Sequence, residues 1–535
     1  MTKEKTKNKN STVYKNAVQL ILVGSITGLF AGIVVTIYNI CASFFEQKSK
    51  GIYELIRQNP LFIPLLILAL VIGSFILSVA IRLVPMIKGS GIPQTEGATR
   101  GAVRFKWYRD LVTMFAVSLV SIFMGLSAGA EGPSVHIGAT VGDGVSAISK
   151  RNEMIRRYQI TGGACAGLAI AVGAPMSGMA FAFEEAHKRF TPEVFICAFS
   201  SVIAGMLTKS WLFSLFNLVS HSGFHSFNLL EIPLAEYGFV VLSAIICGLA
   251  GVLFFKSIFW VKRLLSKINL KRKWQTDWLK MAIAVLIGGL FSLITVNVAG
   301  GGHAFIDTLG SLASSQTPTV FGLPIVWTLA TVLLFKAVTT VFNMGASVPC
   351  GTFIPMLAIG ACIGALTAEV WVGLGMSENS KDALIMICMA SFFATVVKAP
   401  ITAVIMVVEM TFSFTPLLPV IIGVSIGYFI GDVARTDSIY ETLLEEFTKE
   451  HCSTEKAVSY KFTFTAMPLS IAIGREIRDV LWPNGVRVTK ILRGEEVLLP
   501  DGGTVILEGD EIAFTCLTDQ PKLIEDDLRN ILGAK

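Results

Sequence analysis

Apolar segments long enough to cross a bilayer recur along this chain, and they restrict its fold more than any other feature. The chain has 535 residues, of which 53% are hydrophobic and only 15% are charged. A helix of about 20 apolar residues spans the hydrocarbon core of a bilayer. The sequence therefore predicts an all-α polytopic membrane protein, with clear spans at residues 17–45, 61–84, 237–261, 281–298 and 320–342.

Positive charge gathers beside these apolar segments. The net charge is +6, and Lys and Arg cluster at residues 1–16, 150–157 and 261–280. Such clusters mark the cytoplasmic ends of membrane spans. The first apolar segment is too long for a cleaved signal peptide. We therefore expect both termini in the cytoplasm, with the lipid bilayer and not nucleic acid as the partner of the basic clusters.

The cysteines do not follow a metal-binding pattern. Seven of the nine lie in apolar stretches, without a Cys-x-x-Cys pair or a Cys/His cluster at zinc spacing. Buried free thiols are the expected state, and we predict no metal and no cofactor.

The composition changes near residue 445, and this change divides the chain. We expect a basic tail at 1–16, a membrane domain at 17–445, a linker at 446–457 and a small cytoplasmic α/β domain at 458–535.

The last domain shows strand and turn signals. Alternating side chains predict strands at 460–464, 486–491 and 511–517. The sequence PDGG at 500–503 predicts a turn between residues 497–499 and 504–507, and residues 508–510 predict a second turn. A terminal helix is expected at 520–532.

Three Gly/Pro-rich motifs interrupt or open the apolar segments: GSGIP at 89–93, GAEGP at 129–133 and GTFIP at 351–355. Broken helices at membrane depth are tolerated only where the backbone lines a cavity or is packed in protein. Paired breaks in two halves of a transporter point to a binding site near the midplane. The motifs therefore predict such a site.

The membrane part contains an internal repeat. Residues 174–185 parallel 399–410, and residues 133–139 parallel 355–361, at offsets of 225 and 222 residues. Two matches at nearly equal offset indicate duplicated halves, which transporter folds arrange either inverted or parallel.

These breaks have the chemistry of an anion site. Helix N-termini present unpaired N–H groups and a partial positive charge, so several of them aimed at one point can hold an anion. Ser90 adds a hydroxyl, and the helix after Gly351 opens with the N–H groups of Thr352 and Phe353. The Glu131 carboxylate could take the place of the anion when ionised and leave it when protonated.

The order and spacing of the three motifs resemble the CLC family of chloride channels and chloride/proton antiporters. The resemblance implies two inverted repeats and a homodimer with one pore in each subunit. It implies that Ser90, Tyr440 and the amides of Thr352 and Phe353 bind chloride. It also makes Glu131 the gate and Glu185 the internal proton-transfer residue. Ala130 departs from the family, which commonly has arginine before the gating glutamate.

The C-terminal domain is similar to the TrkA-C (RCK-C) module, chiefly through residues 500–503 and 507–511. This resemblance implies a regulatory domain with an unidentified small ligand, and it favours a bacterial plasma membrane as the location.

Each of these residues also has a structural interpretation. Glu185 could pair with Lys188 or Arg189, and the family resemblance favours the proton role. Glu184 and Glu409 are expected to cap helices or pack against backbone, His136 and His303 to be structural, and Gly300-Gly301-Gly302 to be a loop.

Two other functions compete with chloride/proton exchange. One is a passive voltage- or pH-gated chloride channel of the same fold, which Glu185 disfavours. The other is an intramembrane hydrolase, because residues 125–129 match G-x-S-x-G around Ser127. This serine lies in an apolar membrane segment and not in a strand-turn-helix, so we expect a transporter and not an enzyme.

Overall fold

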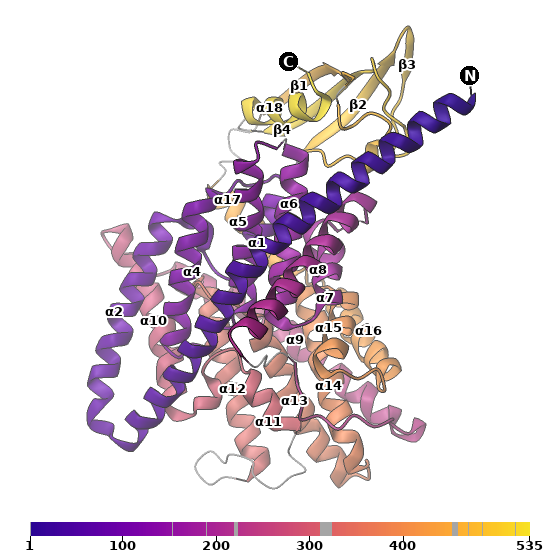
Figure 1. Cartoon of the computed structure of the whole chain (residues 1–535). Coiled ribbons are helices and arrows are strands. Elements are labelled where there is room, and N and C mark those ends of the chain that lie inside the picture. The colour runs from indigo at the N-terminus through magenta and orange to yellow at the C-terminus, as the bar shows by residue number, and fades with distance from the viewer. Residues whose placement is uncertain are drawn as a thin grey trace.

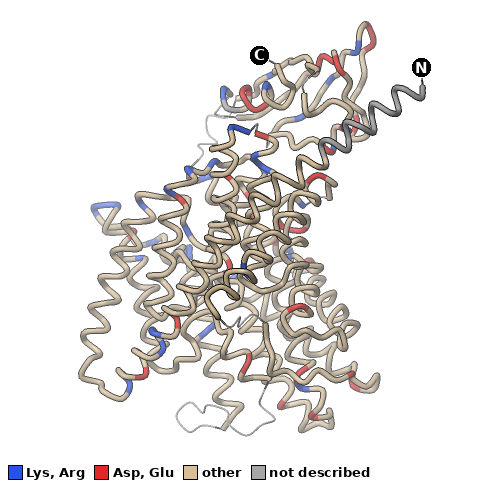
Figure 2. The backbone as a smooth tube through the Cα atoms, in the orientation of Figure 1, with Lys and Arg blue, Asp and Glu red and all other residues tan. Residues whose placement is uncertain are grey.

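A computed structural model describes residues 2–151, 153–188, 190–218, 223–310, 324–451, 458–468, 470–483, 485–518 and 521–534. The chain forms a large helical body with a small sheet domain at one end (Figure 1). Charged residues concentrate toward the ends of the helical body and on the sheet domain (Figure 2). The fold is that of a multi-pass membrane protein with one extramembrane domain.

Eight helices in the described part of the chain are long and apolar enough to cross a membrane, which confirms the expected polytopic class. The span expected at 281–298 ends earlier, at Ile294, because the chain turns toward the loop at 300–302, where Gly300 and Gly302 have positive φ. Residues 320–323 of the last expected span lie outside the described residues. The eight helices are α1 (Thr2–Gln58), α2 (Ile63–Leu83), α8 (Pro192–Leu215), α9 (Tyr237–Ser266), α10 (Lys273–Ile294), α12 (Ile325–Gly345), α13 (Phe353–Gly373) and α14 (Lys381–Val397).

Shorter helices fill the body between these spans, and several begin at the Gly/Pro motifs. They are α3 (Ile92–Thr99), α4 (Trp107–Phe123), α5 (Glu131–Ile148), α6 (Glu153–Val172), α7 (Pro175–Phe181), α11 (His303–Gly310), α15 (Pro400–Thr411), α16 (Leu417–Val433) and α17 (Ile439–His451). A π-helical turn, η3 (Ala182–Ala186), continues α7.

The two halves of the body are inverted copies. Helices α4–α8 correspond in order to α12–α16, and α5 and α13 both begin at one of the broken motifs. Helix α5 leads to α6, which begins beside the C-terminal domain. Helix α13 runs to the opposite end, where Glu236 before α9 accepts hydrogen bonds from Ser377 and Ser380 after α13. The repeat read in the sequence is therefore an inverted one.

Helices α5 and α6 pack backbone against backbone. A Cβ atom on Gly138 would lie 2.1 Å from the carbonyl oxygen of Gly163, and one on Gly163 would lie 2.1 Å from that of Gly138. Small residues permit this close approach in membrane helix pairs. Any larger residue at either position would push α5, and with it Glu131, away from α6.

The C-terminal domain is a four-stranded antiparallel sheet with the order β1-β4-β2-β3. The turns expected at 500–503 and 508–510 are present. Between them residues 504–506 exchange backbone hydrogen bonds with residues 474–477, and Val505 forms an isolated bridge to Glu476. Asp510 accepts from the Leu507 N–H. The elements are β1 (Val458–Thr465), β2 (Val486–Arg493), β3 (Glu496–Leu498), β4 (Glu511–Thr518) and α18 (Pro521–Leu532).

This domain is anchored to the helical body by buried ion pairs. Asp527 of α18 accepts hydrogen bonds from Arg157 of α6, at 3.2 Å, and from Arg104 in the loop before α4. Arg157 also donates to the Leu481 carbonyl, and Arg475 donates to the Tyr158 hydroxyl at 3.1 Å. The basic cluster at 150–157 thus serves as a docking surface as well as a flank of the membrane spans.

Candidate functional site

The three Gly/Pro motifs meet in the interior of the body. Gly129 and Gly351 exchange two backbone hydrogen bonds, of 2.7 and 2.9 Å, as in one step of an antiparallel ladder. A Cβ atom on Gly132 would lie 2.7 Å from the carbonyl oxygen of Ser90 and 3.1 Å from the Cα of Gly351. The N-termini of α3, α5 and α13 therefore converge, and glycine is required where they touch.

Ser90 lies at the start of α3. The next residue, Gly91, has a φ of 79°, in the left-handed region that glycine adopts readily, and this turn directs the chain into the helix. The buried Ser90 hydroxyl oxygen accepts from the Ile92 N–H at 3.4 Å, so its own O–H remains able to donate.

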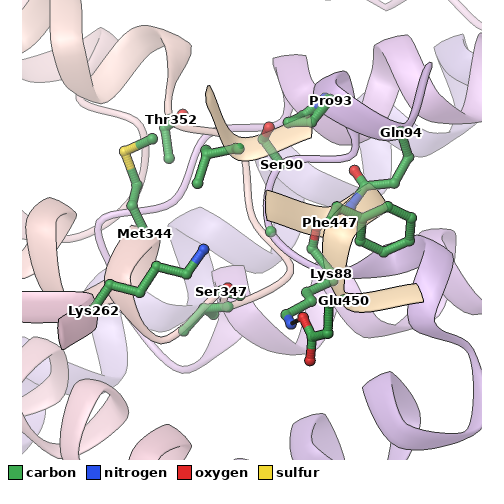
Figure 3. A pocket seen from close by; sticks show the side chains of 13 residues that line it. Lys88, Ser90, Pro93, Gln94, Lys262, Met344, Ser347, Thr352, Phe447 and Glu450 are labelled. Atoms are coloured by element: carbon green, nitrogen blue, oxygen red, sulfur yellow. Dashed lines mark hydrogen bonds and ion pairs between the residues drawn. The ribbon is translucent and has the colours of Figure 1, made fainter. Parts of the chain in front are cut away.

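A cavity of about 40 Å³ reaches Ser90 and Thr352 from the side of the C-terminal domain. Figure 3 shows these two residues at one end of the view and the Lys88–Glu450 pair at the other, with Lys262 to one side. Lys88 and Glu450 are 2.5 Å apart, and Lys262 pairs with Glu446. An anion entering from this side would pass two lysines before it reaches the helix N-termini.

Thr352 and Phe353 open α13, and Tyr440 lies on α17. All three are buried, and the Phe353 N–H is among the first amides of its helix, which have no partner within the helix. The hydroxyls of Thr352 and Tyr440 lie within interaction range of each other, but neither makes a hydrogen bond of standard geometry to any described residue. A ligand at this point could accept from both hydroxyls.

Glu131 is the first residue of α5 and is 3% exposed. Its Oε1 lies 3.7 Å from Nε2 of His303, and its Oε2 has no hydrogen-bond partner among the described residues. A Cβ atom on Gly129 would lie 2.1 Å from Oε2, so this glycine makes the space that the carboxylate occupies. His303, which we expected to be structural, thus lies next to the candidate gate.

Glu185 lies in the π-helical turn η3 and is also 3% exposed. Neither of its carboxylate oxygens is hydrogen-bonded within the described part of the chain. Lys188, one of its two expected partners, pairs with Glu441 instead, and Arg189 lies outside the described residues. Tyr440 is within electrostatic range of both Glu185 and Glu131.

Glu96 is a candidate that the sequence reasoning missed. It is buried on α3, six residues after Ser90, and it interacts electrostatically with Glu185. Arg100 contacts Glu96 at 3.4 Å and donates to the backbone carbonyls of Glu185 and Ala186, at 2.7 and 2.9 Å. The i,i+4 spacing of Glu96 and Arg100 was a visible sign of a helical ion pair. The contact of Arg100 with the carbonyls of η3 was not visible in the sequence.

The two other acids of the repeat cap helices, as expected. Glu409 accepts from the N–H groups of Met176 and Ser177 at the start of α7, each at 2.8 Å. Glu184 accepts from those of Ile401 and Thr402 at the start of α15. These reciprocal caps join the two inverted halves.

His136 and Ser127 have structural partners. His136 lies 3.3 Å from the Gly91 carbonyl and packs edge-on against Phe105. The Ser127 hydroxyl is 2.9 Å from that of Thr340 and not from a histidine, so the G-x-S-x-G match forms no nucleophile elbow.

The fold and the site define a polytopic helical protein with a buried binding site for an anion between two inverted halves. Residues 72–432 match the family model described as "Voltage gated chloride channel", and residues 462–527 match that of the TrkA-C domain. The chain belongs to the voltage-gated chloride channel (CLC) family.

Curated relatives and solved structures agree with this assignment. The H(+)/Cl(−) exchange transporter ClcA of Vibrio cholerae serotype O1 (strain O395) is 30% identical over 455 residues, which cover 81% of this chain and 91% of the relative. ClcA of Yersinia pestis bv. Antiqua (strain Angola) is 26% identical, over 80% and 88%.

Solved structures share the fold. A slow cyanobacterial Cl−/H+ antiporter matches with a TM-score of 0.72 and 23% identity, over 81% of this chain and 99% of that chain. A CLC-type fluoride/proton antiporter matches with a TM-score of 0.63 and 20% identity, over 79% and 97%.

Proposed function

We propose that this chain exchanges chloride for protons across a membrane, with Glu131 as the gate. The relatives named as H(+)/Cl(−) exchange transporters support this proposal, and so does the chemistry of the site. The observation that carries it is the convergence of three helix N-termini beside the buried Glu131 carboxylate, where the backbones of Gly129 and Gly351 pair. Oε2 of Glu131 has no hydrogen-bond partner there among the described residues.

Chloride binds where hydrogen-bond donors converge. The amides of Thr352 and Phe353 carry the partial positive charge of a helix N-terminus, and the hydroxyls of Ser90 and Tyr440 complete the donor set. Binding through dipoles avoids a full positive charge at this point, and such a site can both hold an anion and release it. Lys88 and Lys262 line the cavity mouth, where each is paired with a glutamate.

Glu131 couples the two ions by competition. When ionised, its carboxylate is itself an anion at the N-terminus of α5 and excludes chloride from the outer part of the path. Protonation removes the negative charge, so the side chain loses its attraction to the N–H groups and chloride can replace it. One proton then moves with each opening of the gate.

Glu185 is the internal proton carrier in this mechanism. Its carboxylate is buried and makes no hydrogen bond to a described residue, so it is not held in a structural ion pair. Arg100 fixes the backbone on which it sits, and Glu96 is a second carboxylate beside it. The proton passes from the C-terminal-domain side by way of Glu185 to Glu131.

Proton movement driven by a chloride gradient tests the exchange. The full chain would be reconstituted in sealed proteoliposomes, and a pH electrode would record proton flux. Uphill proton movement is expected in the wild type, whereas Glu131→Gln should pass chloride without protons. Chloride flux without protons in the wild type would favour a passive channel, and intact coupling in Glu131→Gln would refute the gating role.

The remaining features of the proposal concern assembly and location. From the family resemblance we expect a homodimer in a bacterial plasma membrane, with the C-terminal domain and both termini in the cytoplasm. The basic clusters on that side support the orientation. The C-terminal domain acts as a regulator with a small ligand, and the chain works as a transporter and not as an enzyme.

A further inference from the structure

His303 lies next to the gate carboxylate. It is the first residue of α11, and it follows the glycine loop at 300–302. Its Nε2 is 3.7 Å from Oε1 of Glu131. A bridging water, or a small movement of either side chain, would complete a hydrogen bond between the two atoms.

Backbone contacts hold the two residues in this relation. The Ala128 N–H donates to the Gly300 carbonyl at 3.2 Å, and the Gly300 N–H donates to the Leu126 carbonyl at 2.9 Å. A Cβ atom on Gly301 would lie 3.4 Å from the Cα of Gly129. The glycine loop is therefore fixed to the segment that leads into Glu131, and the backbone places His303 next to Glu131.

The two side chains differ in their access to water. The His303 side chain is 33% exposed and that of Glu131 only 4%. His303 begins α11 on the side of the body that faces away from the C-terminal domain (Figure 1). The imidazole packs against Phe224, with ring centroids 5.4 Å apart. A group that reaches water on one side and a buried carboxylate on the other has the geometry of a proton relay.

Fixed charges surround the pair. Lys336 is buried, donates to the carbonyls of Val298 and Gly300 at 3.2 and 3.1 Å, and interacts electrostatically with Glu131. It supplies positive charge near the gate in a chain that has Ala130 in place of an arginine. The other titratable and charged groups near the pair are Tyr38, Glu46 and Lys50 on α1, Asp307 on α11 and Tyr440 on α17.

We propose that His303 carries protons between the outer solution and Glu131. The protonated imidazole gives the proton on Nε2 to Oε1, directly or through one water, and leaves a neutral imidazole and a carboxylic acid. The reverse transfer returns the proton to solution. This role rests on the proposed function of Glu131 as the gate.

Histidine suits this position because it is the side chain that most readily takes up and releases a proton near neutral pH. Above neutral pH free protons are scarce, so a relay that collects and delivers them speeds the protonation of a buried carboxylate. An imidazole that only packed against Phe224 would have no such effect.

The test uses two variants with different structural consequences. His303→Gln keeps a polar side chain, and His303→Phe keeps a ring against Phe224, but neither can carry a proton. Proton-coupled chloride exchange would be measured in proteoliposomes while only the outer pH is varied. His225→Gln is the matched control, because His225 stacks on Phe412 at 5.1 Å and does not contact Glu131.

Both His303 variants should slow exchange about tenfold above neutral pH. This is less than the ~10²–10⁴ typical of a positioned general acid or base, because water can partly replace the imidazole. The rate at acidic outer pH and the proton-to-chloride ratio should not change, and His225→Gln should match the wild type. In a Glu131→Gln background, removal of His303 should have no further effect on the pH profile.

The outcomes separate this inference from the proposed function. A wild-type rate and pH profile in His303→Phe would overturn the relay and leave a packing role. A pH effect of His303→Gln that persists in the Glu131→Gln background would also overturn it, because the histidine would then act elsewhere. If proton flux remained coupled to chloride flux in Glu131→Gln, the proposed function of Glu131 as the gate would be wrong instead.

Discussion

Two regions of this protein bury polar side chains, and they differ in whether those side chains have partners. At the candidate anion site, the carboxylate of Glu185 and the hydroxyls of Thr352 and Tyr440 have no hydrogen-bond partner among the described residues. At the contact between the C-terminal domain and the helical body, Asp527 binds two guanidinium groups, and the interface is built of paired charges.

The difference separates function from architecture. A buried polar group without a partner costs about 1–3 kcal/mol, so a buried carboxylate without a cationic partner beside an ion path favours a proton or a ligand as the missing partner. A buried ion pair needs no ligand, because each charge satisfies the other. Substitutions at the candidate anion site should therefore change transport with little effect on stability. Substitutions at the contact of the C-terminal domain should lower stability with little effect on transport.

Glu185→Gln gives the largest effect that this comparison predicts. It should abolish proton movement and leave chloride flux, because the amide cannot carry a proton and no ion pair is lost. Thermal stability should stay at the wild-type level. Glu369→Gln is the matched control, since that carboxylate is paired with Lys381 at 3.0 Å, and it should keep coupled exchange. Proton transport that survives in Glu185→Gln would leave Glu185 a structural residue.

Asp527→Asn tests the paired region. Asp527 is buried and binds the guanidinium groups of Arg104 and Arg157, so its replacement leaves the buried Arg157 without this carboxylate partner. Removing one partner of a buried pair costs about 3 kcal/mol. We expect faster proteolysis between α17 and β1 and a lower melting temperature, with unchanged chloride affinity.

The neighbouring residue supplies the control for that experiment. Asp526 is exposed on the same helix, so Asp526→Asn should melt like the wild type. Equal stability of the two variants would show that the buried pairs do not hold the domain in place. A loss of chloride binding in Asp527→Asn would remove the distinction between the two regions.

The sequence predicted the candidate anion site better than the contact between the C-terminal domain and the helical body, for a physical reason. Gly/Pro breaks in apolar segments are local signals, so the motifs around Ser90, Glu131 and Thr352 could be recognised before their convergence was seen. The contacts of Arg157 with Asp527 and of His303 with Glu131 join residues far apart in the chain. Nothing in the local pattern distinguishes such an arginine from an ordinary flanking charge, or such a histidine from one that packs in a core.

Tyr440→Phe gives the smallest predicted effect. It also contrasts a buried hydroxyl at the candidate anion site with a buried hydroxyl that is hydrogen-bonded to the backbone. A hydrogen bond to a charged group contributes about 1.5 kcal/mol or more, so chloride binding, measured by calorimetry, should weaken roughly tenfold. Stability should fall little, because the hydroxyl lies near the Thr352 side chain but makes no hydrogen bond of standard geometry to a described residue. Tyr53→Phe is the opposite case, since its buried hydroxyl donates to the Met124 carbonyl at 2.7 Å. It should lower stability by about 1 kcal/mol and leave chloride binding unchanged. If both variants lost stability equally, the Tyr440 hydroxyl would be part of the architecture and not a chloride ligand.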